Sequence, residues 1–271
     1  MDISPKMVKE LRDKTGVGMM DCRKALQESD GDIERAVLYL REKGFEAASK
    51  KAGRESKEGK VFICINEDGT KAAILELSCE TDFVAKNTDF DDLGNQLLAI
   101  LIGHDHIQSL EELNEVKKDG KPIKEVLSEA VLKLGENVNV KQFRILTAGS
   151  AHSYVHSNGK IGVVTAFNQP VDPVLGRDVS MHIAASHPIY ISPEDIPDSE
   201  IQKETEVIQA QLKNEGKPDH ILDQITKGKL SKYYKDVCLL EQPFVKDPDK
   251  QIKCVLPKGT AVTEFLRYAL V

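Results

Sequence analysis

The sequence is poor in several residue types, and each shortage narrows the choice of fold and function. It contains no tryptophan and only 5% aromatic residues, which argues against an aromatic-lined site for a sugar or a lipid. No apolar run approaches the roughly 20 residues that a membrane-spanning helix requires. Lysine and arginine number 37 against 44 for aspartate and glutamate, which gives a net charge of −7. Because unspecific attraction to a phosphate backbone needs positive charge, we expect no nucleic acid as a direct partner. The lack of a long apolar run leads us to expect no membrane as a partner either.

Cysteine is also scarce, and its placement bears on the compartment. The five cysteines lie far apart, and no two of them form a C-x-x-C pair. Such scattered cysteines are typical of a reducing environment. The early acidic residues Asp2, Glu10 and Asp13 argue against a secretory signal or a transit peptide. We therefore expect a cytoplasmic protein.

The N-terminal segment, residues 1–45, predicts a domain of three short helices. Pro5 after a serine is a favoured helix start, and residues 19–28 form a second amphipathic helix. The third helix begins after Asp32 and ends at Gly44, a residue type suited to the position after a helix. Residues 46–58 are rich in alanine, serine and lysine and have almost no large apolar side chain, so we expect a linker there.

The rest of the chain predicts a duplicated core. Residues 59–79 read as a strand, a turn and a strand. The run that begins at Gly159-Lys160-Ile161 repeats the opening at Gly59-Lys60-Val61, and a helical stretch follows each hairpin, at 90–102 and 179–186. Since a lone hairpin is marginal in water, each copy needs a helix on one face. We expect a core N-subdomain at 59–148 and a core C-subdomain at 149–192 and 236–271.

Two further features complete the predicted fold. Residues 123–134 form a clear amphipathic helix that Gly135 ends, and the strand after it changes face near Lys141, which predicts a β-bulge. Residues 193–235 predict an antiparallel helical hairpin, whose narrow apolar seam suggests that it protrudes. The fold class is therefore α+β: a three-helix domain, a duplicated hairpin-plus-helix core and an inserted helical hairpin.

Little in the sequence supports catalysis or metal binding. His104 and His106 lie in a polar loop without a suitably spaced third ligand. His182 and His187 are five residues apart, not the four that place two imidazoles on one helical face. Every Gly-Lys pair lacks the other residues of a phosphate-binding loop. We expect no catalytic residue, no metal and no cofactor.

One segment breaks its local pattern, namely residues 79–87, which we call the corner because a strand gives way there to a helical turn. In one interpretation Thr81 or Asp82 caps a short helix, and Phe83 and Val84 fasten it to the core. In the other, the corner is a wedge that presents Asp82 as a hydrogen-bond acceptor and Phe83 as an apolar anchor for a neighbouring protein. The spacing does not choose between them.

Met19 and Met20 are a second ambiguous pair. Core packing of at least one methionine is the ordinary expectation, but two adjacent helical residues cannot both face inward. An exposed methionine suits an adaptable contact surface.

Two segments carry a distinctive combination of residues. Residues 8–26 contain Thr-Gly-Val-Gly-Met-Met-Asp-Cys-Arg-Lys-Ala-Leu, and residues 81–87 read Thr-Asp-Phe-Val-Ala-Lys-Asn. Both resemble the elongation factor Ts family, as do the shorter runs at 135–140, 153–156 and 242–244. The resemblance extends almost from end to end of the chain, and together these motifs are highly specific.

The resemblance implies a function. Members of the family bind the GTPase elongation factor Tu, in its GDP-bound or nucleotide-free form, and accelerate release of the nucleotide. The resemblance implies no enzymatic activity. It also implies that the three-helix domain is similar to ubiquitin-associated domains, and that the helical hairpin is a coiled-coil insertion through which some members pair, as a homodimer or a 2:2 complex.

The resemblance also implies which residues bind the partner. The corner would enter the GTPase domain near its magnesium-binding region and dislocate the ion. Arg23 stands where relatives often have lysine, which keeps the charge but not the geometry. The implied contact residues are Thr81, Asp82, Phe83 and Val84 in the corner, Arg12, Met19, Met20 and Arg23 in the N-terminal domain, and Leu134 and His156 in the core.

Two other classes of function are rivals. A ubiquitin-binding adaptor built on residues 1–44 would bind ubiquitin through the isolated N-terminal domain. A thiol or metal hydrolase would need a low-pKa cysteine or a stoichiometric metal ion.

Overall fold

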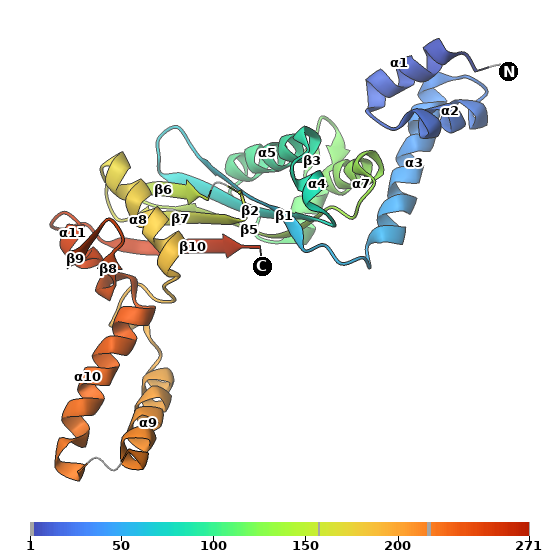
Figure 1. The fold of residues 1–271 in the computed structure, drawn as a ribbon. Helices are drawn as coiled ribbons and strands as arrows, with labels where there is room; N and C mark the ends of the chain where they lie inside the picture. The colour runs from blue at the N-terminus through green and yellow to red at the C-terminus, as the bar shows by residue number, and fades with distance from the viewer. Residues whose placement is uncertain (1–2, 157, 216–217, 271) are drawn as a thin grey trace.

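The computed structural model describes residues 3–156, 158–215 and 218–270. It is an elongated molecule with a three-helix domain at one end, a body of two small sheets in the middle and a helical hairpin at the other end (Figure 1). No helix in the described part of the chain has the length and hydropathy needed to cross a membrane.

The N-terminal domain consists of α1 (Pro5–Thr15), α2 (Met19–Glu28) and α3 (Ile33–Lys51). The predicted caps are confirmed, because the side chains of Ser4 and Asp32 accept backbone N–H groups at the starts of α1 and α3. Gly16 ends α1 at φ 69°, a conformation that glycine adopts without strain. The apolar faces of the three helices meet in one small core.

The predicted end of the third helix at Gly44 is wrong, and the segment predicted as a linker at 46–58 is helical as far as Lys51, which leaves residues 52–57 between α3 and β1. Helix α3 continues to Lys51, because the residues after Gly44 are mostly alanine, glutamate and lysine, which are good helix formers although they give no apolar stripe. Gly44 lies against the neighbouring helix instead. A Cβ atom there would be 3.1 Å from the carbonyl oxygen of Ser128, so the missing side chain allows the two helices to approach.

The body contains two three-stranded antiparallel sheets with the same topology. In each sheet a hairpin is followed by a helix and by a third strand, which pairs with the second strand of the hairpin. The first sheet consists of β1 (Glu58–Ile65), β2 (Lys71–Cys79) and β5 (Asn139–Thr147), and the second of β6 (Ser150–Val155), β7 (Ile161–Phe167) and β10 (Val262–Ala269). The predicted duplication is therefore present in the fold.

The register of that duplication differs from the prediction. Gly59-Lys60-Val61 lies in β1, the first strand of its hairpin, whereas Gly159-Lys160-Ile161 leads into β7, the second strand of the other. The segment that begins at Gly159 was predicted to open the second hairpin, but residues 150–155, which precede it, form the first strand of that hairpin. The two similar segments are instead neighbours across the sheets, since the Val61 N–H donates to the Gly159 carbonyl at 2.8 Å.

The two sheets pack face to face through mainly aliphatic side chains, and helices cover their outer faces (Figure 1). On the first sheet these are α5 (Thr88–Gly103) and α7 (Ile123–Leu134), with the short α4 (Asp82–Ala85) and α6 (Leu110–Glu115) beside them. On the second sheet the cover is α8 (Pro173–Ser186). The bulge is confirmed, because Glu76 pairs with Gln142 and Leu77 with Val140, which leaves Lys141 as the extra residue.

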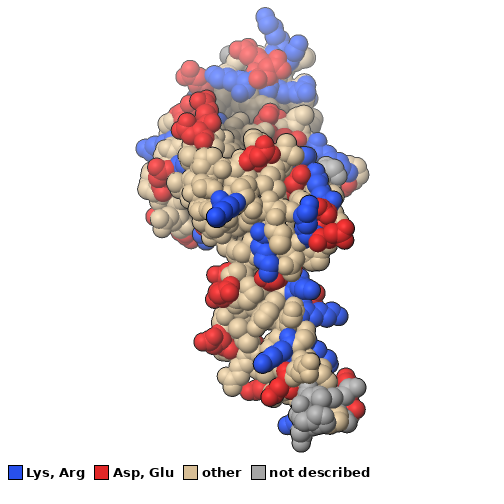
Figure 2. Space-filling model, turned by 90° about the vertical axis from the view of Figure 1, so that its left-hand side faces the viewer, with Lys and Arg blue, Asp and Glu red and all other residues tan. Residues whose placement is uncertain are grey.

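The predicted helical hairpin is formed by α9 (Asp198–Asn214) and α10 (Asp219–Val237). Its own small core includes Ile208, Leu212 and Leu222, and it projects from the body as a narrow arm (Figure 2). The chain also contains short elements outside the two main sheets, most of which connect this arm to the second sheet. They are β3 (Lys117–Lys118), β4 (Lys121–Pro122), η1 (Pro193–Asp195), η2 (Leu239–Glu241), β8 (Pro243–Phe244), β9 (Asp247–Gln251) and α11 (Ile252–Val255), of which β3 and β4 form a separate two-residue ladder near α7.

Candidate functional site

The corner is a sharp turn between β2 and α4. Thr81 is the N-cap of α4, and its Oγ1 accepts the Val84 N–H at 3.4 Å. Val84 and Ala85 are buried, but the side chain of Phe83 is 81% exposed. The two interpretations of the corner are thus both partly met: Thr81 caps the helix and Val84 fastens it to the core, while Phe83 points into solvent.

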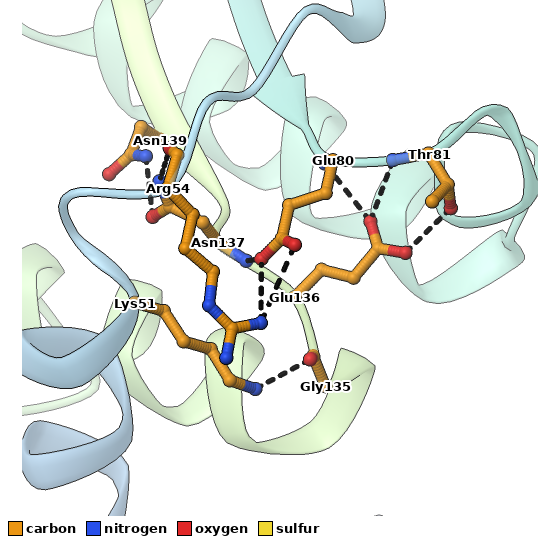
Figure 3. Close-up of polar contacts among 8 residues, drawn as sticks. All are labelled: Lys51, Arg54, Glu80, Thr81, Gly135, Glu136, Asn137 and Asn139. Carbon is orange, nitrogen blue, oxygen red and sulfur yellow. Dashed lines mark hydrogen bonds and ion pairs between the residues drawn. The ribbon is translucent and has the colours of Figure 1, made fainter.

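A carboxylate from a distant loop accepts the free backbone donors of the corner. Oε2 of Glu136 accepts the N–H groups of Glu80 and Thr81 at 3.0 and 2.9 Å, and its Oε1 accepts the Thr81 hydroxyl at 2.6 Å (Figure 3). Glu136 follows Gly135, which ends α7 at φ 79°. Hydrogen bonds to an ionised acceptor are stronger than neutral ones, so this contact fixes the backbone direction at the start of α4.

The contact is reciprocal, because Glu80 binds back to the same loop. Its Oε1 accepts the Asn137 N–H at 2.7 Å and lies 3.5 Å from Nη1 of Arg54. The Asn137 side chain in turn donates to the Arg54 carbonyl at 2.9 Å, and Lys51 at the end of α3 donates to the Gly135 carbonyl (Figure 3). The corner and the chain that leaves the N-terminal domain are therefore attached to one loop, residues 135–138.

Two oppositely charged side chains pair with each other at the tip of the corner. Asp82 and Lys86 form an exposed pair one helical turn apart, 2.6 Å between Oδ2 and Nζ. The hydrogen bond from Lys86 lowers the pKa of Asp82 below its usual value, so Asp82 is an anion at neutral pH. At the base, burial raises the pKa of the Cys79 thiol to about 12, which keeps it protonated and unsuited to nucleophilic attack.

The N-terminal candidates all lie on the surface of the three-helix domain. Arg12 is exposed on α1, and Arg23 is exposed on α2. Met19 is 45% and Met20 77% exposed. The expectation that at least one methionine packs in the core is wrong, because Cys22, Ala25 and Leu26 already occupy the inward positions of α2.

The two core candidates differ in exposure. Leu134, in the last turn of α7, is half-buried and packs against the first core, one residue before the loop that contacts the corner. His156 is exposed in the β6–β7 turn, with its Nδ1 3.4 Å from the Tyr154 hydroxyl. The structure thus places Leu134 beside the corner's supporting loop, and His156 on a separate turn.

Two of the other histidines have hydrogen-bond partners within the fold. His182 is fully buried; its Nε2 lies 2.9 Å from Oε1 of Gln242, and its Nδ1 accepts the Val245 N–H at 3.3 Å. His104 bonds to the Ile100 carbonyl. In the ranges that the structure describes, no group of three or more histidine, cysteine or acidic residues could hold a metal ion.

The sequence analysis assigned no role to three charged residues of the site, Arg54, Glu80 and Glu136, although Glu80 lies in the corner and Glu136 in the run at 135–140. Each is a charged residue in a polar stretch, and such residues are ordinarily solvated. The one available signal was the run of polar residues that starts at Gly135, directly after a helix end and before a strand, where backbone groups need partners.

An exposed aromatic side chain on a fixed base is characteristic of surfaces that bind another protein. Comparison with known proteins places the chain in a class: the family model described as "Elongation factor TS" matches residues 80–271, the range that starts at the corner. The class is thus that of the translation elongation factors.

Curated relatives identify the family over the full chain. The protein is 45% identical to elongation factor Ts of Halothermothrix orenii over 100% of this chain and 93% of the relative. It is 44% identical to that of Clostridium perfringens, over 98% and 92%, and 42% identical to that of Aquifex aeolicus, over 99% and 97%. The chain belongs to the elongation factor Ts family.

Proposed function

We propose that this protein is the guanine-nucleotide exchange factor of elongation factor Tu, and that it acts by inserting the corner near the magnesium site of the GTPase. The observation that carries this proposal is Phe83, a large apolar side chain that is 81% exposed on a base fixed by buried neighbours and charged hydrogen bonds. Leaving it in water is unfavourable unless a partner covers it.

The mechanism follows from how GTPases bind their nucleotide. Phosphate-loop amides, a lysine and Mg²⁺ secure the phosphates. A protein that binds best to the conformation in which some of these contacts are displaced weakens the nucleotide, and each tenfold weakening corresponds to about 1.4 kcal/mol of that preference. Because such coupling is reciprocal, newly bound GTP weakens the exchange factor in turn and releases it.

The corner and the N-terminal domain would have different roles in nucleotide exchange. Phe83 would fill an apolar pocket, and the anionic Asp82 would compete for groups that face the ion. The exposed Met19, Met20 and Arg23 of the N-terminal domain, which we propose is of the ubiquitin-associated type, would bind the same GTPase and supply affinity. A flexible thioether surface suits such a contact.

The test is stopped-flow release of a fluorescent GDP analogue from elongation factor Tu with and without this protein. We expect the release rate to rise and to saturate with protein concentration. An unchanged rate at saturating protein contradicts the proposal. Binding of ubiquitin by the full chain, followed by NMR, would favour the adaptor instead.

We also propose that the helical hairpin pairs with a second copy of the chain. Val207 is 50% exposed on α9, next to the residues that form the seam between α9 and α10. A sedimentation experiment should show a dimer that Val207→Lys dissociates; a monomer at all concentrations contradicts this pairing.

A further inference from the structure

The sheet provides no hydrogen-bond acceptors for the backbone N–H groups at the start of the corner. The ladder between β1 and β2 ends at the pair Glu58 and Cys79, and the ladder between β2 and β5 ends at Ser78 and Asn139. The N–H groups of the next two residues therefore have no strand partner. Without another acceptor, the chain between β2 and α4 could take several directions.

Helix α4 cannot fix that direction by itself. It spans only four residues, Asp82–Ala85, and so short a helix is unstable unless other contacts stabilise it. Burial of Val84 and Ala85 fastens its underside. The orientation of its first turn, which carries Phe83, depends on the two residues that precede it.

Glu136 supplies the missing acceptor for both of them. All three of its hydrogen bonds go to residues 80 and 81, at 2.6–3.0 Å, and the reverse bond from Asn137 to Glu80 closes the contact (Figure 3). Glu136 is a half-buried loop residue that contributes nothing to the apolar core. Its hydrogen bonds concern the corner alone.

We infer that Glu136 is a positioning residue for nucleotide exchange: it aims Phe83 by accepting the backbone donors of residues 80 and 81. This inference rests on the proposed function. A pre-oriented side chain loses less conformational freedom on binding than one that must be ordered, so loss of Glu136 weakens the step in which Phe83 enters its pocket. Initial binding through the N-terminal domain is unaffected.

The first experiment measures GDP release from elongation factor Tu as a function of protein concentration. Glu136→Ala is expected to lower the maximal release rate about tenfold, while the half-saturating concentration changes less than about twofold. Glu136→Gln keeps an acceptor oxygen at the same reach and is expected to stay within about threefold of the wild-type rate. A Gln variant as slow as the Ala variant contradicts positioning by hydrogen bonds.

The decisive comparison is a double-mutant cycle with Phe83→Ala. If Glu136 acts through Phe83, Glu136→Ala causes no further loss once Phe83 is absent. Equal losses in both backgrounds would show a general structural role and overturn the inference. So would a Glu136→Ala variant as fast as the wild type.

A second readout does not depend on the GTPase. Amide hydrogen exchange at Thr81, Val84 and Ala85 is expected to speed up in Glu136→Ala and not in Glu136→Gln, while the amides of β1 and β2 stay protected. Unchanged exchange in the corner overturns the inference even if the wild type releases GDP. If the wild type fails to release GDP but the corner loosens as expected, the proposed function fails and the positioning of Phe83 stands.

Discussion

The two halves of the body share one topology, but different chemistry supports the turn after the second strand of each hairpin. In the first half, the loop before β5 contacts the corner through the carboxylates of Glu80 and Glu136. In the second half, the loop before β10 contacts the turn after β7 through amides: Ala261 N–H donates to Oδ1 of Asn168 at 2.9 Å, and Nε2 of Gln169 donates to Oγ1 of Thr260 at 2.8 Å.

This difference coincides with what each turn presents. The helix after the first turn exposes Phe83 at its second position, whereas α8 exposes the smaller Val174 at its second position, with 65% of its surface in contact with solvent. Charged acceptors make stronger hydrogen bonds than neutral amides. The stronger support is therefore found under the larger exposed side chain, which is the arrangement expected if only the first turn must withstand insertion into a partner.

The largest expected effect is on exchange, and it separates the two turns. Phe83→Ala should slow GDP release from elongation factor Tu about 10- to 100-fold, the usual cost of removing an aromatic anchor from an interface. Val174→Ala is the matched control, since it truncates an exposed apolar residue at the corresponding position, and should leave the rate unchanged. Equal rates for both variants would mean that the two turns do not differ in function.

A second contrast concerns what each half carries. The first half carries the N-terminal domain, fastened by the ion pair between Arg41 on α3 and the buried Glu125 on α7. Arg41→Ala leaves that carboxylate without its cation and should lower the free energy of unfolding by about 2 kcal/mol, measured by urea denaturation. Glu125→Gln added to Arg41→Ala should recover part of the loss. No recovery would mean that Arg41 stabilises by packing rather than by charge.

A third contrast concerns helical glycines, because each half has one glycine that packs against an aromatic ring of its own sheet. A Cβ on Gly94 of α5 would meet the tip of the Phe62 ring at 2.4 Å, and one on Gly176 of α8 would meet Cγ of His152 at 2.2 Å. The ring tip of Phe62 can tilt away, but Cγ of His152 is tied to the backbone. Gly176→Ala should therefore lower the free energy of unfolding by about 1–2 kcal/mol and Gly94→Ala by less, because the cost of overpacking exceeds the gain in helix propensity. Reversed values would contradict this comparison.

The smallest effect is a pH dependence confined to the second half. Burial lowers the pKa of His182 below its usual 6.5, and the same cause lowers the pKa of His152. Between about pH 6.5 and the lowered pKa values of these histidines in the folded protein, the unfolded chain binds more protons than the folded one. The free energy of unfolding therefore decreases as the pH falls through this range. Protection factors, which are exchange rates corrected for the intrinsic pH dependence of amide exchange, should be lower at pH 5.5 than at pH 7.5 in α8 and not in α5. His182→Gln should reduce this difference, and an unaltered profile would exclude His182 as its source.

Local patterns predicted much of the fold. The caps at Ser4 and Asp32, the end of α7 at Gly135 and the bulge at Lys141 were all visible in the sequence, because each depends on residues close together in the chain. The end of α3 was not, since Gly44 marks a helix end only when nothing packs against it. Here α7 packs against Gly44. The contacts between α3 and α7 join residues far apart in the sequence: Arg41 and Glu125, for example, are separated by 84 positions.

The corner shows the same division. Its residues were identified from the sequence, and Thr81 was one of two predicted caps, but the exposure of Phe83 and of both N-terminal methionines was not predicted. Exposure depends on whether another part of the chain covers a side chain. Helical periodicity predicts which face of an element turns inward, but α4 is too short to have a period.

The sequence by itself determined most of the elements, the existence of a duplication and the family, because helix propensity, capping residues and motifs depend on neighbouring residues. Only the tertiary structure decided that α3 continues to Lys51 and packs against α7, that the two repeats align strand by strand in a different register, and that Glu136 supports the corner. Those outcomes depend on contacts between residues more than fifty positions apart, such as the bond between Thr81 and Glu136. No local pattern encodes which distant donors and acceptors the packing of the sheets and helices will bring together.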